Sequence, residues 1–327
     1  MKKRNQIGLR VKALVTAVIL VLLVACSAVA EVKTPFLRLD RDKLGAWQGE
    51  LDNVRTVVGD RFEYQSVKKK YGIDPEFQPA SDGLDTLCIS GSAQFSTPQF
   101  RKLAATLREC AGDKTVYIID LRQESHVLVN EGIPISWYGK HNWGNEGKTL
   151  EQIEADEAER FGALIGSTVS AYARSDDEVI DEMVITVESV MTEKELVESE
   201  GFKYLRLPIR DHSWPAPETI DTFVSFVKSI DRSWLHFHCQ AGNGRTGLMM
   251  ILYDMMMNPG VPMYDIVVRQ TKLGASYVLY TEDSDNYKVP LYAEKAKMTP
   301  LFYEYVQQQH GSNYEVPWSV WLKEHTT

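Results

Sequence analysis

The pattern of apolar and polar residues predicts alternating strands and helices from about residue 84 onward. Leu84–Ile89 and Val116–Leu121 are short apolar runs typical of buried strands. Between them, Thr97–Cys110 carries apolar residues at helical spacing, and its second residue is a proline, which is typical of a helix start. A strand, a helix and a second strand in this order predict a βαβ-like unit, and therefore an α/β fold.

The middle of the chain has a different pattern, with short strands around one acidic helix. The predicted strands are Ile133–Tyr138, Val169–Tyr172 and Met183–Val190, and the predicted helix is Leu150–Ile165. We therefore expect residues 126–192 to form a small β-rich module inserted into a larger α/β domain. That larger domain then comprises residues 31–125 and 193–327.

The second half of the chain alternates strands and helices most clearly. Its predicted strands are Phe202–Ile209 and Trp234–His238, and its predicted helices are Thr192–Glu200, Glu218–Ile230, Thr246–Met257, Met263–Leu273 and Leu291–Gln309. The strand Trp234–His238 runs into a loop with two glycines and then into an apolar helix. This loop is therefore the first candidate for a catalytic or binding site.

The first thirty residues have the pattern of a secretory signal, a basic leader followed by the apolar run Ala13–Ala25. Leu23–Cys26 (LVAC) resembles a bacterial lipobox, in which Cys26 is lipidated and becomes the first residue, whereas Ala28–Ala30 (AVA) fits an ordinary signal peptidase site. The run is shorter than the ~20 residues of a membrane span, which disfavours an uncleaved anchor. We expect the rest of the chain to be secreted, periplasmic or anchored as a lipoprotein of a bacterium.

The net charge of the chain limits the classes of molecule that it can bind. The chain has 36 basic and 45 acidic residues, a net charge of −9, and loss of the five basic residues of the leader brings the net charge to −14. An acidic chain is a poor general binder of nucleic acids, because affinity for the phosphate backbone needs a basic face. With 44% apolar residues, the composition also excludes a disordered chain or a collagen-like repeat.

Three cysteines remain after the leader, too few for a disulfide framework. Cys88 lies in an apolar run and Cys110 ends a helical one, so both are interpreted first as buried small side chains. An oxidising compartment leaves a bridge between these two open. Cys239 lies in a loop of a different kind.

The segment that follows Trp234–His238 has the composition of a phosphate-binding loop. Between Cys239 and Arg245 it contains Gln240, Ala241, Gly242, Asn243 and Gly244. Glycines let successive backbone N–H groups point to one centre, and the following helix adds its positive end. This field favours the thiolate of Cys239 as a nucleophile, and Arg245 can hold two oxygens of a bound dianion. Thr246 is placed to donate a hydrogen bond to the sulfur and assist its departure.

The loop resembles that of the protein-tyrosine-phosphatase superfamily, and Asp211–Pro215 (DHSWP) resembles the general-acid loop of the same superfamily. The resemblance implies that Asp211 protonates the departing oxygen and then activates water. Two simpler interpretations stay open: a buried cysteine before a helix-capping loop, and an aspartate that caps the helix starting near Pro217. This chemistry needs no cofactor, and the sequence shows no spacing typical of metal ligands.

Longer motifs are similar to those of the bacterial cysteine phytases, phosphatase-like enzymes that remove phosphates from myo-inositol hexakisphosphate (phytate). They are Asp120–His126 (DLRQESH), Gly132–Gly139 (GIPISWYG), Asp211–Glu218 (DHSWPAPE), Leu235–Cys239 (LHFHC) and Pro317–Lys323 (PWSVWLK). The similarity covers about residues 50–325. It implies a central mixed sheet flanked by helices, a small inserted partial β-barrel, and phosphate release through a phosphocysteine intermediate.

The same resemblance implies four substrate contacts outside the loop. Arg55 matches an arginine that reaches a substrate phosphate, His212 a substrate-contacting histidine beside the general acid, and Lys288 a lysine of the substrate pocket, with Tyr292 near its rim. A surface charge is the alternative interpretation of each. The partner implied is a small polyphosphate rather than a nucleic acid, and contact with a membrane is expected only through lipidated Cys26.

Two positions depart from the family pattern. Asn142 precedes Trp143 where well-known members carry an acid, and Arg174–Glu178 (RSDDE) stands where they carry a cluster of lysine and histidine. Loss of cationic contacts there predicts weaker or reoriented binding of a hexakisphosphate. Two other functions therefore stay open, a protein tyrosine or dual-specificity phosphatase and a non-catalytic phosphate-binding module. A sulfurtransferase is a further alternative, but its chemistry has no use for Asp211.

Overall fold

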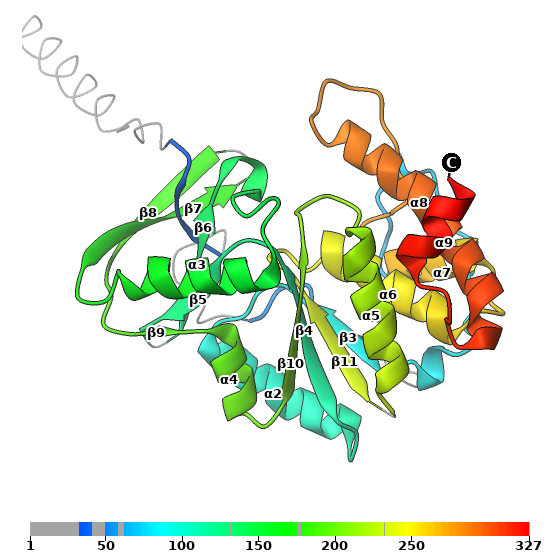
Figure 1. The fold of residues 1–327 in the computed structure, drawn as a ribbon, viewed down its shortest axis with the longest axis horizontal. Coiled ribbons are helices and arrows are strands. Elements are labelled where there is room, and N and C mark those ends of the chain that lie inside the picture. Colours follow the sequence, from blue (N-terminus) through cyan, green and yellow to red (C-terminus); the bar gives the residue numbers. More distant parts are fainter. Residues whose placement is uncertain are drawn as a thin grey trace, which may run out of the picture.

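The computed structural model describes most of the chain after the leader, in two sheets with their helices (Figure 1). The described residues are 33–40, 50–57, 62–130, 132–175, 178–231 and 233–326. The predicted signal segment 1–30, with Cys26, lies outside them. None of the helices in these ranges is long and apolar enough to cross a membrane.

The larger domain is built on a five-stranded mixed sheet. Its strand order is β10 (Lys203–Ile209), β4 (Val116–Arg122), β11 (Trp234–His238), β3 (Ile89–Ser92) and β2 (Arg55–Val57). The first four strands are parallel, and β2 is antiparallel to β3. In this register His238 lies opposite both Ser92 and Asp120, so the carboxyl ends of three strands meet at one edge. The loop that begins with Cys239 leaves the sheet at that edge, where ligands of parallel sheets usually bind.

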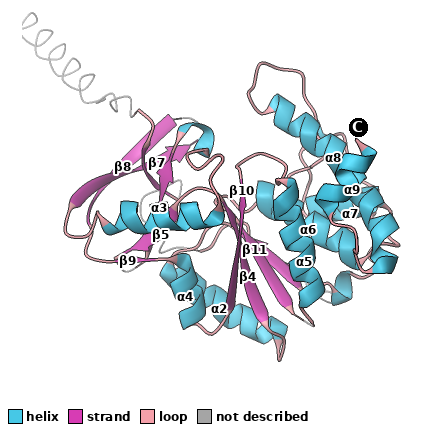
Figure 2. Cartoon of the chain, in the orientation of Figure 1, coloured by secondary structure: helices cyan, strands magenta, loops and turns pink. Residues whose placement is uncertain are grey.

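Helices cover both faces of this sheet, because neighbouring strand residues point to opposite sides (Figure 2). Ile118 packs with α2 (Thr97–Ala111) and α4 (Glu193–Ser199), whereas Ile119 packs on the other face. That second face is covered by α5 (Pro217–Ser229), α6 (Gly244–Met257), α7 (Met263–Lys272), α8 (Val289–Gln309) and α9 (Trp318–His325). The α6 helix is apolar on nearly all sides because it is buried along almost its whole length.

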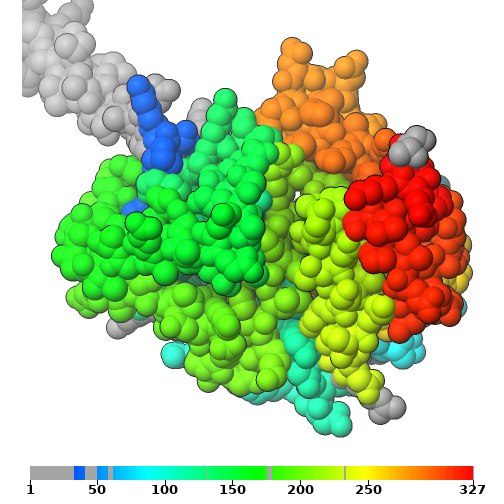
Figure 3. Space-filling view, viewed as in Figure 1, coloured from blue at the N-terminus to red at the C-terminus, as the bar shows by residue number. Residues whose placement is uncertain are grey.

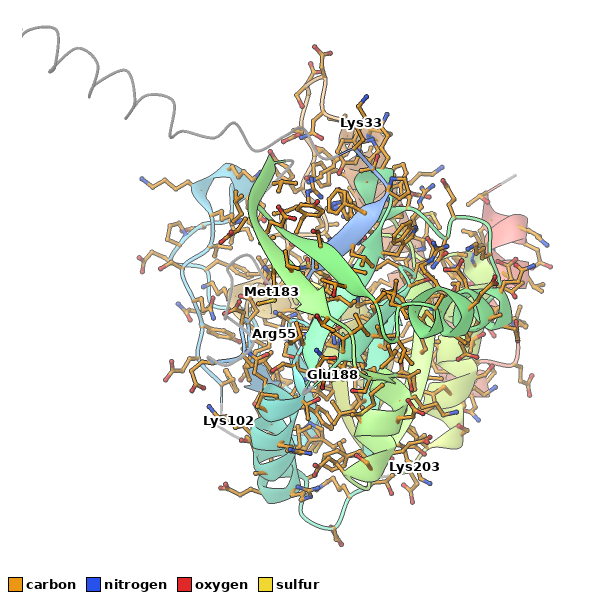
Figure 4. All side chains as sticks on the ribbon, turned by 90° about the vertical axis from the view of Figure 1, so that its left-hand side faces the viewer. Lys33, Arg55, Lys102, Met183, Glu188 and Lys203 are labelled. Carbon is orange, nitrogen blue, oxygen red and sulfur yellow. The ribbon has the colours of Figure 1, made fainter. Side chains whose placement is uncertain are left out.

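A second, six-stranded sheet forms the smaller part of the molecule (Figure 4). Its order is β8 (Glu178–Thr186), β7 (Thr168–Ser175), β1 (Phe36–Leu39), β6 (Ile133–Tyr138), β5 (His126–Val129) and β9 (Val190–Met191). Helix α3 (Leu150–Gly162) packs on it through the fully buried Phe161. Among the described strands, β8 and β9 are the edges, so this sheet is open, and a partial barrel is not confirmed.

Short 3-10 turns join several of these elements. They are η2 (Lys69–Tyr71), η3 (Leu84–Thr86), η4 (Lys140–Asn142) and η5 (His310–Ser312). Three helices begin with capping boxes, in which Ser96, Thr149 and Thr192 each accept a hydrogen bond from a backbone N–H at the first turn. These caps explain why the predicted starts of α2, α3 and α4 agree closely with the structure.

The structure differs from expectation at two elements. The segment Phe36–Leu39, which we assigned to the larger domain, pairs with β6 and β7 of the small sheet. A four-residue strand carries too little pattern to reveal its partner. The expected strand Leu84–Ile89 is a 3-10 turn over its first half, and β3 begins only at Ile89, because Cys88 takes a positive φ of 49° that interrupts the extended backbone. Cys88 and Cys110 are not joined by a disulfide.

Candidate active site

A cavity of about 510 Å3 opens at the carboxyl edge of the larger sheet. Its walls come from segments far apart in the sequence: the loop after β11, the loop after β10, the small sheet, and the segment that leads into α8. In the space-filling view, the segment before α8 (orange) projects at one edge of the molecule, and the small sheet (green) forms another part of the surface (Figure 3). Cys239, Asp211 and Arg245 all line this cavity.

Cys239 is only 3% exposed, and its Sγ accepts two hydrogen bonds. The backbone N–H of Gly242 donates to Sγ at 3.3 Å, and the hydroxyl of Thr246 donates to it at 3.2 Å. Both donors stabilise a sulfur that carries negative charge. The hydroxyl of Thr246 lies where the sequence reasoning expected it, within reach of the sulfur.

The path of the loop depends on glycine at one position. Gly242 has a φ of 78°, and a Cβ on it would lie 2.6 Å from the backbone N of Ala93. Only glycine tolerates both that conformation and that contact. The loop is also tied from outside, because the Asn53 amide donates to the carbonyl of Ala241 at 2.7 Å and the Gln240 amide donates to the carbonyl of Asp40 at 3.2 Å. Asn243 and Gly244 then lead into the N-terminus of α6 and line the cavity.

Arg245 is fixed by a buried carboxylate. Its Nη1 and Nη2 donate to the two oxygens of Glu124 at 2.6 and 3.0 Å, and neither side chain is more than 2% exposed. Its Nε has no hydrogen-bond partner among the described residues and lies 3.4 Å from Oδ1 of Asp211. Burial opposes the charged form of Arg245, but Asp211 and Glu124 outweigh it and raise its pKa well above the ordinary value. The guanidinium is therefore permanently charged and already oriented.

Glu124 belongs to a chain of buried ion pairs that joins the two sheets. It accepts from Arg122 at 2.9 Å, and Arg122 donates to Asp40 at 2.8 Å. Arg38 donates to the same Asp40 at 2.8 Å. Burial alone would raise the pKa of Asp40, but Arg122 and Arg38 lower it to about 2. Because Arg38 lies on β1 and Arg122 on β4, this network aligns the two sheets at the cavity.

Asp211 is held from three sides. Asn142 donates to its Oδ2 at 3.1 Å, the indole N–H of Trp143 donates to its backbone carbonyl at 3.0 Å, and Arg245 lies beside its Oδ1. Burial would raise the pKa of Asp211, but Arg245, His212 and the bond from Asn142 together lower it. These partners favour the ionised carboxylate, and a dianion bound to Arg245 would favour its protonated form.

The contact between Asn142 and Asp211 depends on two unusual turns. His141, Asn142 and His212 have φ values of 57°, 67° and 66°, in the left-handed region. The ring of His141 stacks on Tyr287 at 3.7 Å, which joins the turn η4 to the segment before α8. Such backbone strain persists only where the surroundings enforce it, and it clusters at functional sites.

Three of the four substrate contacts implied by the resemblance line the cavity. They are His212, Lys288 and Tyr292. Burial lowers the pKa of His212, with Asp211 acting in the opposite direction. The neutral form of His212 is therefore favoured.

Arg55 lies elsewhere, among the inner side chains near the middle of Figure 4. It lines a neighbouring pocket of about 220 Å3 that also contains Gln65 and Lys68. Its Nη1 donates to the carbonyl of Gly274 at 3.2 Å, and its Nη2 is buried without a partner in the described part of the chain. Burial lowers the pKa of Arg55 to about 10, and Cys239 acts against this shift.

The structure adds cationic side chains that sequence reasoning missed. Lys295 lines the cavity from α8, and burial lowers its pKa to about 8, although Asp211 acts to raise it. Lys295 follows Lys288 by seven residues on the same helical segment, so the spacing could have placed both on one face. Arg38 and Arg174 line the cavity from the small sheet, both near the ring of Tyr138. The segment Arg174–Glu178, which lacks the lysine and histidine cluster of the family, therefore still contributes one cation, Arg174, to the cavity wall.

One group of side chains among the described residues has the spacing of metal ligands, Asp120, His126 and Glu193. No sequence motif pointed to this group, because the three residues lie on three different elements. One oxygen of Asp120 already accepts hydrogen bonds from Tyr204 at 2.8 Å and lies 3.1 Å from Nε of Arg206. The cluster is thus a buried hydrogen-bonded network with a cation already present, and we assign no metal to it.

Comparison with known proteins agrees with this geometry. Residues 119–257 match the family model of the PTP-like phytases, and the description of that family names inositol hexakisphosphate. The tandemly repeated PTP-like phytase of Mitsuokella multacida is 39% identical, with a TM-score of 0.81 over 88% of this chain and 49% of that one. A PTP-like phytase of Bdellovibrio bacteriovorus is 29% identical, with a TM-score of 0.62 over 84% of this chain and 96% of that one.

Among curated proteins, effector protein hopD2 of Pseudomonas syringae pv. tomato is 29% identical over 252 residues, 73% of this chain and 52% of its own length. The chain thus spans about half the length of the first relatives it matches. The predicted α/β phosphatase-like fold is confirmed by the Mitsuokella and Bdellovibrio structures. The loop motifs, the fold and the family model agree, and together they support the predicted relationship of this chain to the bacterial cysteine phytases, the PTP-like phytase family.

Proposed function

We propose that this protein is a phosphomonoesterase that hydrolyses myo-inositol polyphosphates, with phytate as the first candidate, through a phosphocysteine intermediate. The observation that carries the proposal is the convergence of Cys239, Arg245 and Asp211 in one cavity whose walls hold several further cations. A related phosphatase of Mitsuokella multacida, 38% identical, has been solved in complex with myo-inositol-(1,3,4,5)-tetrakisphosphate, which supports this substrate class.

In the first step, the Cys239 thiolate attacks phosphorus, and the bond between phosphorus and the inositol oxygen breaks. Arg245 and the N–H groups at the start of α6 hold the phosphoryl oxygens, since first-turn N–H groups have no partner within the helix. The leaving oxygen receives the electron pair of the broken bond and a proton from Asp211. Because Glu124 already orients Arg245, little reorganisation is needed as charge moves.

In the second step, water attacks the phosphorus of phosphocysteine. Asp211, now ionised, accepts a proton from this water, and the phosphorus–sulfur bond breaks with the electron pair returning to sulfur. The donors Gly242 and Thr246 stabilise the departing thiolate. The products are inorganic phosphate, an inositol with one phosphate fewer, and the starting form of the enzyme.

Phosphate release from phytate, with the product isomers resolved, tests the proposal directly. We expect release by the wild-type chain and a loss of at least about 1,000-fold in the Cys239→Ser variant, because a serine hydroxyl is not ionised at working pH. A phosphotyrosine peptide is the comparison substrate. Faster release from the peptide than from phytate would favour the protein phosphatase, and tight phytate binding without turnover would favour a binding module.

We also propose that residues 1–30 direct the protein out of the cytoplasm, with cleavage either before a lipidated Cys26 or after Ala30. The supporting feature is the basic and apolar order of the leader with its lipobox-like end. Metabolic labelling with a fatty acid in a bacterial host distinguishes the two cleavage sites. A lipoprotein is labelled and loses its label in Cys26→Ala, whereas an unlabelled chain beginning at Glu31 indicates ordinary cleavage.

A further inference from the structure

The three consecutive lysines Lys68–Lys70 do not all face the same way in the structure. Lys68 and Lys70 line the active-site cavity, whereas Lys69, between them, does not. Lys68 also lines the neighbouring pocket that contains Arg55. Two lysines of this short turn therefore face the cavity, and the third does not.

The turn itself is held in place by aromatic packing. Tyr71, its last residue, packs on Tyr277 and Tyr280 with ring centroids 5.5 Å apart in both cases. The backbone N–H of Tyr71 donates to the carbonyl of Lys68 at 2.9 Å, and Gly72 ends the turn with a φ of 65°. This anchoring fixes which way the turn presents its side chains, so the division among the lysines follows from its geometry.

The two ammonium groups are available to an anion. Within the described part of the chain, neither lies within ion-pair distance of a carboxylate, and both side chains are exposed. Lys70 lies over the ring of Tyr280, with Nζ 4.5 Å from the ring centroid, a contact that holds an ammonium without neutralising it. Lys70 acts electrostatically on Glu282, whose carboxylate already accepts a hydrogen bond from the hydroxyl of Tyr280 at 2.7 Å.

We propose that Lys68 and Lys70 form a second phosphate subsite, which binds phosphates of an inositol polyphosphate other than the one being transferred. The inference rests on the proposed function, because it requires a substrate with several phosphates. The loop around Cys239 accommodates one phosphate dianion, so the remaining phosphates of the same molecule need cations elsewhere in the cavity. A net-acidic protein cannot supply that attraction through its overall field, so local pairs of lysines must.

The chain offers a matched control. We compare the double variant Lys68→Ala/Lys70→Ala with Lys69→Ala, which removes a charge from the same turn. With phytate at low ionic strength, we expect kcat/KM to fall about tenfold in the double variant and to change less than about twofold in Lys69→Ala. The loss should shrink with added salt and should be larger for phytate than for p-nitrophenyl phosphate, which has a single phosphate.

Binding separates this inference from the proposed function. In a Cys239→Ser background, calorimetry with phytate should show one molecule bound per chain and about tenfold weaker binding after loss of Lys68 and Lys70.

Equal effects of the double variant on phytate and p-nitrophenyl phosphate, or an equal effect of Lys69→Ala, would overturn the subsite. If wild-type protein binds phytate through these lysines but releases no phosphate, the proposed activity fails while the subsite stands. A second phytate lost only in the double variant would instead mean that the lysines bind a separate anion, which also overturns the inference.

Discussion

The floor and the rim of the active-site cavity hold their charges in opposite ways. We define the floor as Cys239, Arg245 and Asp211, and the rim as Lys68, Lys70, Lys288 and Lys295. Arg245 is buried and bonded to both oxygens of Glu124, whereas Lys68 and Lys70 are exposed and have no carboxylate partner among the described residues. A fixed floor can stabilise developing charge without reorganising, and flexible cations can adapt to different arrangements of phosphates. We therefore expect the floor to determine the reaction and the rim to determine which substrate binds.

The largest expected effect comes from the floor. Asp211→Asn removes the proton donor but keeps a similar shape, so we expect kcat with phytate to fall about 1,000-fold. Hydrolysis of p-nitrophenyl phosphate should fall less, because nitrophenolate leaves without a proton. Steady-state rates with the two substrates provide the measurement. Equal losses on both would show that Asp211 positions the phosphate rather than protonating the leaving group.

The next effect tests whether the fixed position of Arg245 matters. Glu124→Gln leaves the buried guanidinium partly uncompensated, and we expect the free energy of unfolding to fall by about 3 kcal/mol. We expect kcat to fall about tenfold in the protein that remains folded, because Arg245 loses its orientation. Urea unfolding and rate measurements check this. Glu146→Gln, at an exposed ion pair with Arg210, is the control and should change stability by less than about 1 kcal/mol.

A smaller effect is expected on the rim. The pKa of Lys295 is lowered to about 8, so this side chain carries its charge below that pH and loses it as the pH rises above. In a Cys239→Ser background, phytate binding should weaken about threefold across this range and stay constant in Lys295→Arg, which remains charged. Lys297→Gln, on an exposed part of the same helix and outside the cavity lining, should retain the wild-type profile. A flat wild-type profile would remove Lys295 from the substrate site.

The smallest effect concerns the pH dependence of the floor. Asn142 donates to the ionised carboxylate of Asp211, and this bond contributes to its lowered pKa. Loss of the donor in Asn142→Leu should raise the pKa of Asp211, so that the acid form persists to higher pH. The falling limb of the kcat/KM profile with phytate should then move upward by as much as about one pH unit. Lys140→Ala, an exposed change in the same turn, should leave the limb where it is.

Elements with a strong local pattern could be predicted, and contacts made across the fold could not. The strand Trp234–His238 agrees with the structure residue for residue, since its three apolar residues and two histidines lie between clear loop signals. Asn142 was recognised only as a departure from the family, because its partner Asp211 is 69 residues away and the contact depends on positive φ values at both turns. Arg55 matched its family context, but its place in a neighbouring pocket follows from packing against Gly274 and Met250.

The short strand β1 restricts how this molecule can be divided. Its four residues pair with β6 on one side and contact β7 on the other, although they precede the larger sheet in the sequence. Excision of residues 126–192 as one continuous piece would leave β1 with two unpaired edges and expose Leu37 and Leu39, which now pack in the core of the small sheet. A chimera that transfers the small sheet to another phosphatase must therefore take Phe36–Leu39 as well, as a second, separate segment of the graft.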